Sequence, residues 1–349
     1  MPRKLPSILV GLIGRLVHLR FNLESTGREM EDQITVERLV AHASRVTSLR
    51  TLRFFDYTWN AHYLPQVDLY QLRYLPNLQS FMMASCLPPR SRPSSQLRQL
   101  AECPSLTDVD CCQLDENGTS VELEQFIDLR AGNADTAPIK HFAVRGHVSA
   151  DELSQLARIP GLRSFRQSHL RASVTEKDLV AFIARLPLLE HIELNAQNND
   201  CFLDPLCAAV VCKQMVETCF STLSIVDLAH FNLSGATLQV LCVGLPLLRK
   251  LWLSDCIVDT LEVLASTHKP VDFQYNLSAD MSANIAFPWA LLATIRPGSV
   301  AKLWVILELE DDHPAKDEQE IRAFRDALGA KRFHLKQQHK HNTLVVVQD

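Results

Sequence analysis

Four histidines are the first places to look for chemistry in this sequence: His141, His169, His191 and His230. Imidazole is a common metal ligand and general base. His169 and His230 share a position in a recurring pattern, but they are expected two strands apart, or about 10 Å at ~4.8 Å per strand. Ligands of one ion lie about 2 Å from it, so this pair does not share a metal. Asp227 lies near His230, but no nucleophile with a base partner completes a site.

Cysteine patterns and nucleotide-binding motifs give no stronger signal of catalysis. The ten cysteines include no CxxC pair, and several occur in apolar runs such as 206–212. The adjacent Cys111 and Cys112 are expected to point to opposite faces of a strand. No P-loop, GxGxxG or HExxH motif is present. We therefore expect a reduced, intracellular chain of the cytoplasm or nucleus that is not an enzyme and needs no cofactor or metal.

The positions of these histidines and cysteines depend on a leucine-rich segment that recurs along the chain. Leu223-Ser-Ile-Val226-Asp-Leu228 and Leu248-Arg-Lys-Leu251-Trp-Leu253 carry apolar residues at matching positions. Successive copies begin 23 to 34 residues apart, which leaves room for a strand, a turn and a helix in each. The eleven copies begin at Leu16, Leu49, Leu78, Leu106, Ile139, Leu162, Leu189, Leu223, Leu248, Val271 and Val300.

Helix signals fill the segments between the strands. Ser149 and Glu152 have the spacing of a capping box, as do Thr175 and Asp178, and apolar residues at helical spacing follow each pair. Proline recurs a few residues before many strands, where a helix must end. One strand–helix unit cannot bury its apolar side alone, so stacked units are expected to share a continuous core and a parallel sheet.

These residues resemble the leucine-rich repeats of the ribonuclease-inhibitor-like superfamily, and most closely the cysteine-containing repeats of F-box proteins in ubiquitin ligases. Cys86 and Cys256 stand where other repeats have Asn, and Cys103 precedes a strand as in that class. The resemblance covers about residues 12–307. It implies an α/β leucine-rich-repeat solenoid, a horseshoe with the sheet on its concave face and the helices on its convex face. It also implies substrate recognition for a ubiquitin ligase, which depends on an F-box that this sequence does not show.

The concave face is the expected binding surface. Residues between the second and third apolar positions of a copy point away from the core. Trp252 is the most informative of them, because an exposed tryptophan among charges is typical of a binding hot spot; the alternative is that it packs against a neighbouring repeat or cap loop. The predicted partner-binding residues are Arg166, Glu193, Asp227, His230, Lys250, Trp252, Asp255 and Trp304.

Composition limits the kind of partner. The net charge of −5 over 349 residues gives no broad basic field, which argues against nucleic acid. No apolar stretch approaches the ~20 residues that cross a membrane. We expect a monomer that binds a protein, either as the substrate-binding part of a ligase receptor or as a stand-alone scaffold or inhibitor.

The two ends of the chain are expected to differ from the repeats. Residues 1–307 are predicted to form the repeat domain of ten or eleven units, and residues 308–349 a C-terminal cap with a helix at 317–328 and short strands at 331–336 and 343–347. The apolar run 5–14 imitates a secretory signal, but we expect a first repeat helix because no small-x-small cleavage site follows. The Pro/Ser/Arg stretch 87–95 is expected to be a surface linker, with a regulatory or partner contact as the alternative.

Overall fold

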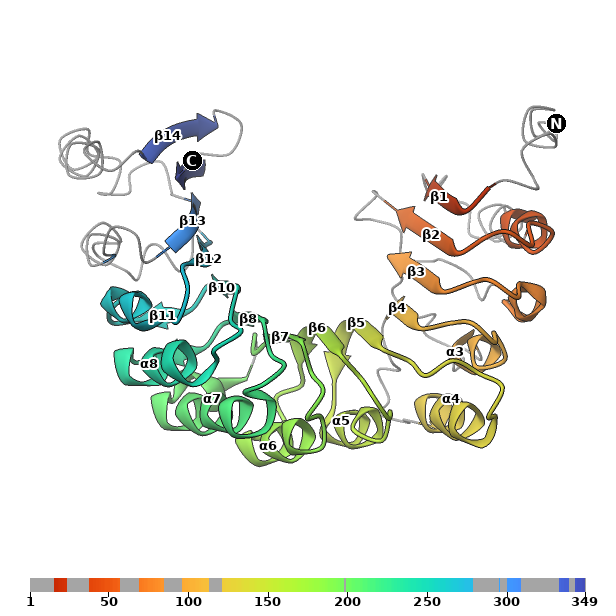
Figure 1. Cartoon of the computed structure of the whole chain (residues 1–349), viewed down its shortest axis with the longest axis horizontal. Helices are drawn as coiled ribbons and strands as arrows, with labels where there is room; N and C mark the ends of the chain where they lie inside the picture. Colours follow the sequence, from red (N-terminus) through yellow and green to blue (C-terminus); the bar gives the residue numbers. More distant parts are fainter. Residues whose placement is uncertain are drawn as a thin grey trace. The chain divides into compact units, whose positions relative to one another are not determined.

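The computed structural model describes most of the repeat region (Figure 1). The described residues are 16–23, 38–56, 69–84, 96–112, 121–197, 199–278, 295, 300–308, 333–338 and 343–348. The expectations for residues 5–14, 87–95 and 317–328 lie outside them. The chain divides into two compact units, Met1–Ser168 and His169–Asp349, and the division falls within strand β6 (Ser164–Leu170). Each unit is described by itself.

The first unit alternates strands with short helices. Its strands pair in parallel and in chain order: β1 (His18–Leu23), β2 (Thr51–Asp56), β3 (Ser80–Ala84), β4 (Asp108–Cys112) and β5 (His141–Val148). Its helices are η1 (Tyr70–Tyr74), α3 (Gln96–Leu100), α4 (Val121–Gly132) and α5 (Ala150–Leu156), and residues 38–43 are also helical. Neighbouring helices pack side by side, so strands and helices form two layers.

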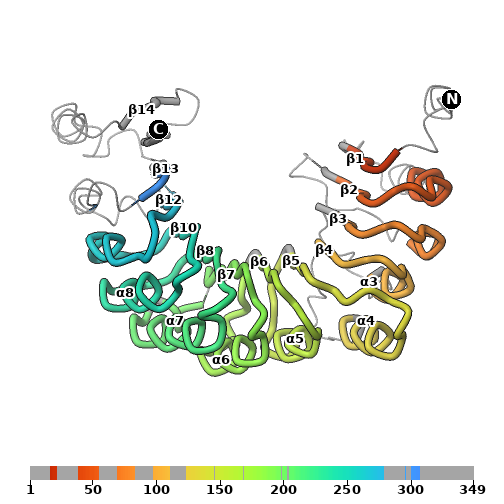
Figure 2. The backbone as a smooth tube through the Cα atoms, viewed as in Figure 1, coloured from red at the N-terminus to blue at the C-terminus, as the bar shows by residue number. Residues whose placement is uncertain are grey.

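The second unit repeats this plan. Its parallel strands are β7 (His191–Asn195), β8 (Ile225–Ala229), β10 (Lys250–Ser254), β12 (Val271–Leu277) and β13 (Val300–Glu308). Its helices are α6 (Glu176–Ala184), η2 (Asp200–Leu203), α7 (Pro205–Cys219), α8 (Gly235–Gly244) and η3 (Glu262–Ser266). Short strands β9 (Asn232–Leu233) and β11 (Ile257–Val258) pair beside the main sheet. Figure 2 shows the chain running from strand to helix and back in the repeats whose connecting segments it draws in colour.

The predicted α/β class with a long parallel sheet is confirmed, because the described chain contains eleven parallel strands accompanied by helices. Each of the eleven predicted copies supplies one of them. The last parallel strand, β13, pairs with β15 (Thr343–Gln348) in antiparallel fashion, and β15 pairs in turn with β14 (Phe333–Gln338). The two strands predicted near the C-terminus are therefore present, and they extend the sheet beyond its last repeat.

Alternating burial explains why the leucine pattern forms strands. In β7, β8 and β10 every second residue is buried and the residues between them are partly exposed. Across the second unit the buried side chains align in two rows that run from repeat to repeat. The first row is Ile192, Val226, Leu251, Phe273 and Leu303. The second row is Leu194, Leu228, Leu253, Tyr275 and Val305. All ten are at most 1% exposed, and each such burial stabilises the fold by about 1.5–3 kcal/mol.

The predicted helix starts are confirmed by their capping contacts. Ser149 and Glu152 form a reciprocal capping box at α5, and Thr175 and Asp178 form another at α6. The Ser234 side chain accepts a hydrogen bond from the Thr237 amide at α8. Each contact satisfies an amide that the first helical turn leaves without a partner.

Buried cysteines fill the small sites at the ends of repeats. The Cys256 thiol donates to the carbonyl of Leu228 at 3.2 Å, and the Cys219 thiol donates to the carbonyl of Leu186 at 3.3 Å. Burial raises the pKa of Cys256 to about 12 and that of Cys219 to about 11. These thiols stay protonated at neutral pH, so their role is packing.

Within the described part of the chain, no helix combines the length and apolar character that crossing a bilayer requires.

Candidate functional site

The partly exposed face of the sheet in the second unit holds most of the predicted binding residues. Strand register places one residue from each of five neighbouring strands in a single row. The row is Glu193, Asp227, Trp252, Gln274 and Trp304. Adjacent members lie about 4.8 Å apart because that is the spacing of hydrogen-bonded strands. We call this set the tryptophan row.

Trp252 lies on this face because its neighbours in the strand face inward. Leu251 and Leu253 are fully buried, whereas Trp252 is partly exposed. The Lys250 ammonium lies 5.2 Å from the centre of the indole ring. A cation over the face of an indole is attracted by the ring's quadrupole, so Lys250 steadies the ring. Trp304 is 43% exposed and lies two strands away.

Charged and amide groups flank the tryptophan row on both sides. On one side, Lys250, Asp272 and Lys302 follow one another across adjacent strands, so their charges alternate. On the other side, the Asn276 amide donates to the Ser254 hydroxyl at 3.3 Å. The Gln274 amide donates to the Asn276 side-chain oxygen at 3.2 Å. Charged groups of both signs therefore lie on one side of the two indoles, and hydrogen-bonded amide groups lie on the other.

His230 and Asp255 meet where β8 and β10 end. His230 Nε2 lies 3.8 Å from Asp255 Oδ2, and both residues have positive φ, 61° and 51°. This backbone shape directs the His230 amide to the carbonyl of Ser254 at 2.9 Å. The Asp255 carboxylate also accepts a bond from the Ser278 amide at 2.6 Å. Hydrogen bonds to the next repeat thus fix both side chains at the same edge of the sheet.

Acidification should destabilise the wild-type chain more than the variant His230→Asn. Burial lowers the pKa of His230 below its ordinary value of 6.5, and the Asp255 carboxylate only partly opposes that shift. Below pH 6.5, His230 therefore binds more protons in the unfolded chain than in the folded chain. The free energy of unfolding that is present above pH 6.5 is consequently reduced as the pH falls. Asparagine tolerates the positive φ and does not titrate. Denaturant unfolding from about pH 7 to about pH 5 checks this; parallel curves for the two proteins would refute it.

The structure brings seven of the eight predicted site residues onto one sheet face and its edge. They are Glu193, Asp227, His230, Lys250, Trp252, Asp255 and Trp304. Each is partly or fully exposed. Arg166 is exposed on β6, but it belongs to the first unit.

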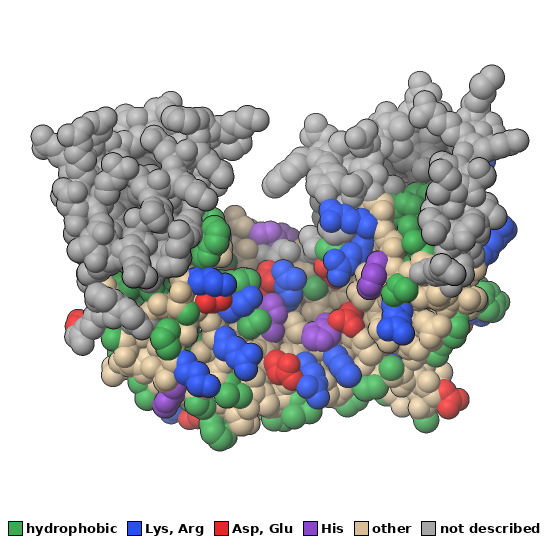
Figure 3. All heavy atoms as spheres, turned by 45° about the horizontal axis from the view of Figure 1, so that its top comes forward, with side chains coloured by type: hydrophobic (Ala, Val, Ile, Leu, Met, Phe, Trp, Pro, Cys, Tyr) green, Lys and Arg blue, Asp and Glu red, His purple; other side chains and the backbone are tan. Residues whose placement is uncertain are grey.

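The predicted binding site did not include the residues that flank the tryptophan row. Asp272, Lys302, Ser254 and Asn276 were absent from the predicted set, although the period of two along each strand indicates that they face the same way as the tryptophan row. Figure 3 shows basic, acidic and histidine side chains intermixed on the face that it displays. Lys and Arg side chains are the more frequent charged groups in that view, and Asp, Glu and His side chains lie among them.

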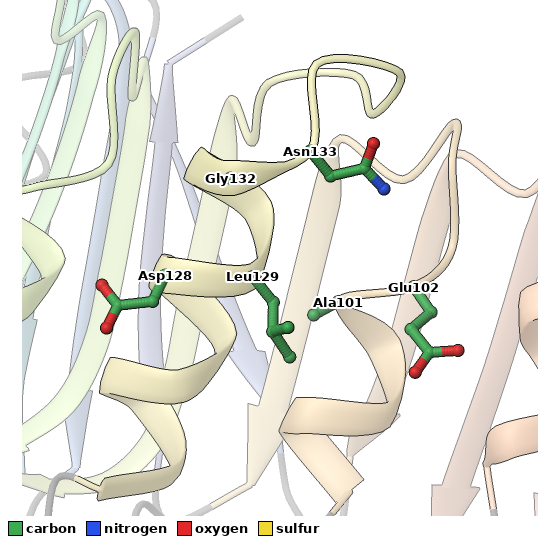
Figure 4. A pocket seen from close by; sticks show the side chains of 6 residues that line it. All are labelled: Ala101, Glu102, Asp128, Leu129, Gly132 and Asn133. Carbon is green, nitrogen blue, oxygen red and sulfur yellow. The ribbon is translucent and has the colours of Figure 1, made fainter.

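A shallow cavity of about 510 Å³ in the first unit lies between α3 and α4 (Figure 4). Leu129 faces Ala101, while Asp128 and Glu102 point away from the space between them. Asp128 pairs with Arg158 at 2.5 Å, and Glu102 pairs with Arg73 at 3.2 Å. Because arginines already neutralise both carboxylates, this cavity offers no convergent polar groups for a ligand.

No protein-family model matches this chain, and a search of curated proteins finds no match either. The fold and the surface described above are therefore the basis for assigning a function.

Proposed function

We propose that this chain binds a protein partner, without catalysis, through the tryptophan row and its flanking residues. The observation that carries the proposal is the placement of two partly exposed indoles, Trp252 and Trp304, in register on one sheet face. Tryptophan is enriched among residues that dominate binding energy, and such residues cluster within a polar rim. Lys250, Asp272 and Lys302 supply charged groups of that kind.

The arrangement favours a partner with apolar side chains surrounded by charges of both signs. Alternating Lys250, Asp272 and Lys302 would match a surface with the complementary order of charges. Such a pattern orients a partner and excludes others more than it adds affinity. The two indoles would supply most of the affinity.

The cysteine-containing repeat pattern favours a particular role. Within the proposal, the repeats form a leucine-rich-repeat horseshoe whose concave face carries the tryptophan row. The resemblance to F-box proteins supports substrate recognition for a ubiquitin ligase, provided that an F-box is supplied outside this sequence. Buried Cys103 and Cys256, at the positions typical of that repeat class, support this assignment.

A stand-alone scaffold or inhibitor is the second candidate. The tryptophan row favours this second role, because a row of residues that crosses five strands can cover a wide area of one partner's surface. This role needs no additional domain, and the same residues would make the contact.

Affinity purification of the tagged full chain, with identification and quantification of bound proteins, separates the two roles. Recovery of a cullin-ligase adaptor supports the receptor. One stoichiometric partner without ligase components supports the scaffold or inhibitor. In either case the double variant Trp252→Ala/Trp304→Ala should lose the partner, and the control Leu206→Ala on exposed α7 should keep it. A partner retained equally by both variants contradicts the proposed surface.

A further inference from the structure

Two thiols and a carboxylate converge at the start of two helices in the second unit, away from the tryptophan row. Glu176 is the first residue of α6, Cys201 lies in η2, and Cys207 lies in the first turn of α7. The two sulfur atoms are 3.3 Å apart, and Cys201 Sγ lies 3.7 Å from Glu176 Oε2. All three potential ligand atoms lie within 4.8 Å of one another. We call this set the dithiol cluster.

The surrounding backbone fixes the dithiol cluster in place. Asn199 is buried, and its amide nitrogen donates to the carbonyls of Val174 at 2.7 Å and Arg171 at 3.2 Å. Its side-chain oxygen accepts from the Cys201 amide at 3.1 Å. One side chain thus ties η2 to the segment that leads into α6. The Asp204 carboxylate caps α7 beside Cys207.

The cluster also differs from the other cysteines in exposure. Of the seven cysteines whose surroundings are described, only Cys201 and Cys207 are partly exposed, and the other five are buried. A buried thiol fills space in a core, but these two are accessible from solvent. Packing alone does not account for a partly exposed pair of thiols beside a carboxylate.

The spacing of the three atoms suits a metal ion rather than a disulfide. Zinc–sulfur bonds of about 2.3 Å and zinc–oxygen bonds of about 2.0–2.2 Å, arranged tetrahedrally, separate ligand atoms by about 3.5–3.8 Å. The observed sulfur–sulfur and sulfur–oxygen separations of 3.3 and 3.7 Å lie within about 0.5 Å of those values, and the third pair lies within 4.8 Å. A disulfide needs about 2.05 Å between the sulfurs, and both cysteines are free.

The electrostatics of the cluster also favour a cation. The pKa of Cys207 is raised to about 11, first by desolvation, then by Cys201, and then by the carboxylates of Glu176 and Asp204. Protons therefore compete with a metal ion for this thiol, and metal binding should strengthen as the pH rises. The same negative surroundings attract a divalent cation, which would displace the thiol protons.

We propose that Glu176, Cys201 and Cys207 form a binding site for one thiophilic divalent cation of the Zn²⁺ type. Both thiolates and the carboxylate supply three ligands, and the fourth position is open to water or another ligand. Binding replaces the two thiol protons by the metal ion and releases them to solvent. The ion would fasten η2 and the starts of α6 and α7 to one another. This site is independent of the tryptophan row and does not rest on the proposed function.

Cobalt titration of the reduced, metal-stripped full chain tests the site, because Co²⁺ bound by thiolate has a charge-transfer absorption. We expect one equivalent per chain to give this band and Zn²⁺ to abolish it by competition. Cys201→Ser and Cys207→Ser should each weaken binding about 100-fold or more, and Glu176→Gln at least about 10-fold, because loss of even a residue that only supports a ligand costs about 10–100-fold. Apparent affinity should rise with pH, because the metal competes with protons.

Two variants elsewhere serve as controls. Cys242→Ala removes a buried thiol from α8, and Glu217→Gln removes an exposed carboxylate from the far end of α7. Both should keep the band, and circular dichroism should show all variants folded. A band unchanged in the double variant Cys201→Ser/Cys207→Ser would overturn the proposal. Failure of the reduced wild type to bind Co²⁺ saturably would overturn it too, whether or not the two cysteines form a disulfide in air.

Discussion

Replacing Phe231 with alanine is expected to lower the free energy of unfolding by about 3–5 kcal/mol. Phe231 is fully buried, and its ring lies 5.1 Å from that of Phe202, centre to centre. It occupies the repeat position where Cys256 stands one copy later. Truncation removes a large apolar side chain and leaves a cavity between neighbouring repeats, which close packing prevents from collapsing fully. Chemical unfolding followed by circular dichroism measures the loss.

Phe220→Ala is the matched control for this substitution. Phe220 caps the end of α7 and is 56% exposed, so the same chemical change should alter the free energy of unfolding by less than about 0.5 kcal/mol. A loss in Phe231→Ala as small as that in Phe220→Ala would mean that Phe231 is not part of the core. The leucine pattern would then be out of register in this repeat.

Replacing Trp252 with alanine is expected to weaken partner binding about 30-fold or more, or at least about 2 kcal/mol. The indole lies between two buried leucines of β10 and near the middle of the tryptophan row. Its loss removes a large apolar contact together with the surface on which Lys250 rests. Because the ring is partly exposed, thermal stability should change little, by less than about 1 kcal/mol. Calorimetry with the purified partner and unfolding of the free chain measure the two effects.

Two further variants sharpen that test. Trp252→Phe retains an aromatic surface and should recover part of the lost affinity. Val240→Ala shortens an exposed apolar side chain on α8 and should leave affinity unchanged. A large loss of stability in Trp252→Ala with binding preserved would show that Trp252 serves the fold rather than recognition.

The strands and helix starts were predictable because their signals are local. Alternating apolar residues fix which side chains of a strand face inward, and this places Trp252 between Leu251 and Leu253 on the partly exposed face. Capping residues such as Ser149 and Thr175 act within one turn of their own helices. Both signals are visible in a short window of sequence.

The dithiol cluster could not be predicted in the same way. Cys201 and Cys207 are six positions apart, a spacing that matches no short cysteine motif, and Glu176 precedes them by a whole repeat. The apolar run 206–212 indicated burial, but Cys207 is partly exposed. Asn199, which links η2 to the preceding repeat, carries no sequence signal of its own.

The backbone conformation at His230 and Asp255 could not be predicted from sequence patterns either. Positive φ at residues other than glycine is uncommon, and here it accompanies hydrogen bonds from both backbone amides to the next strand. Those bonds form only when neighbouring repeats stack. The contact between the two side chains is therefore a product of the assembled sheet.

Site-specific photocrosslinking shows directly whether the partner contacts the tryptophan row. A photoreactive amino acid is placed at Gln274, between the two indoles, and separately at Phe220 on α7. We expect a covalent adduct with the partner from position 274, reduced in the Trp252→Ala background, and none from position 220. An adduct from position 220 alone would contradict this expectation and place recognition on the helices.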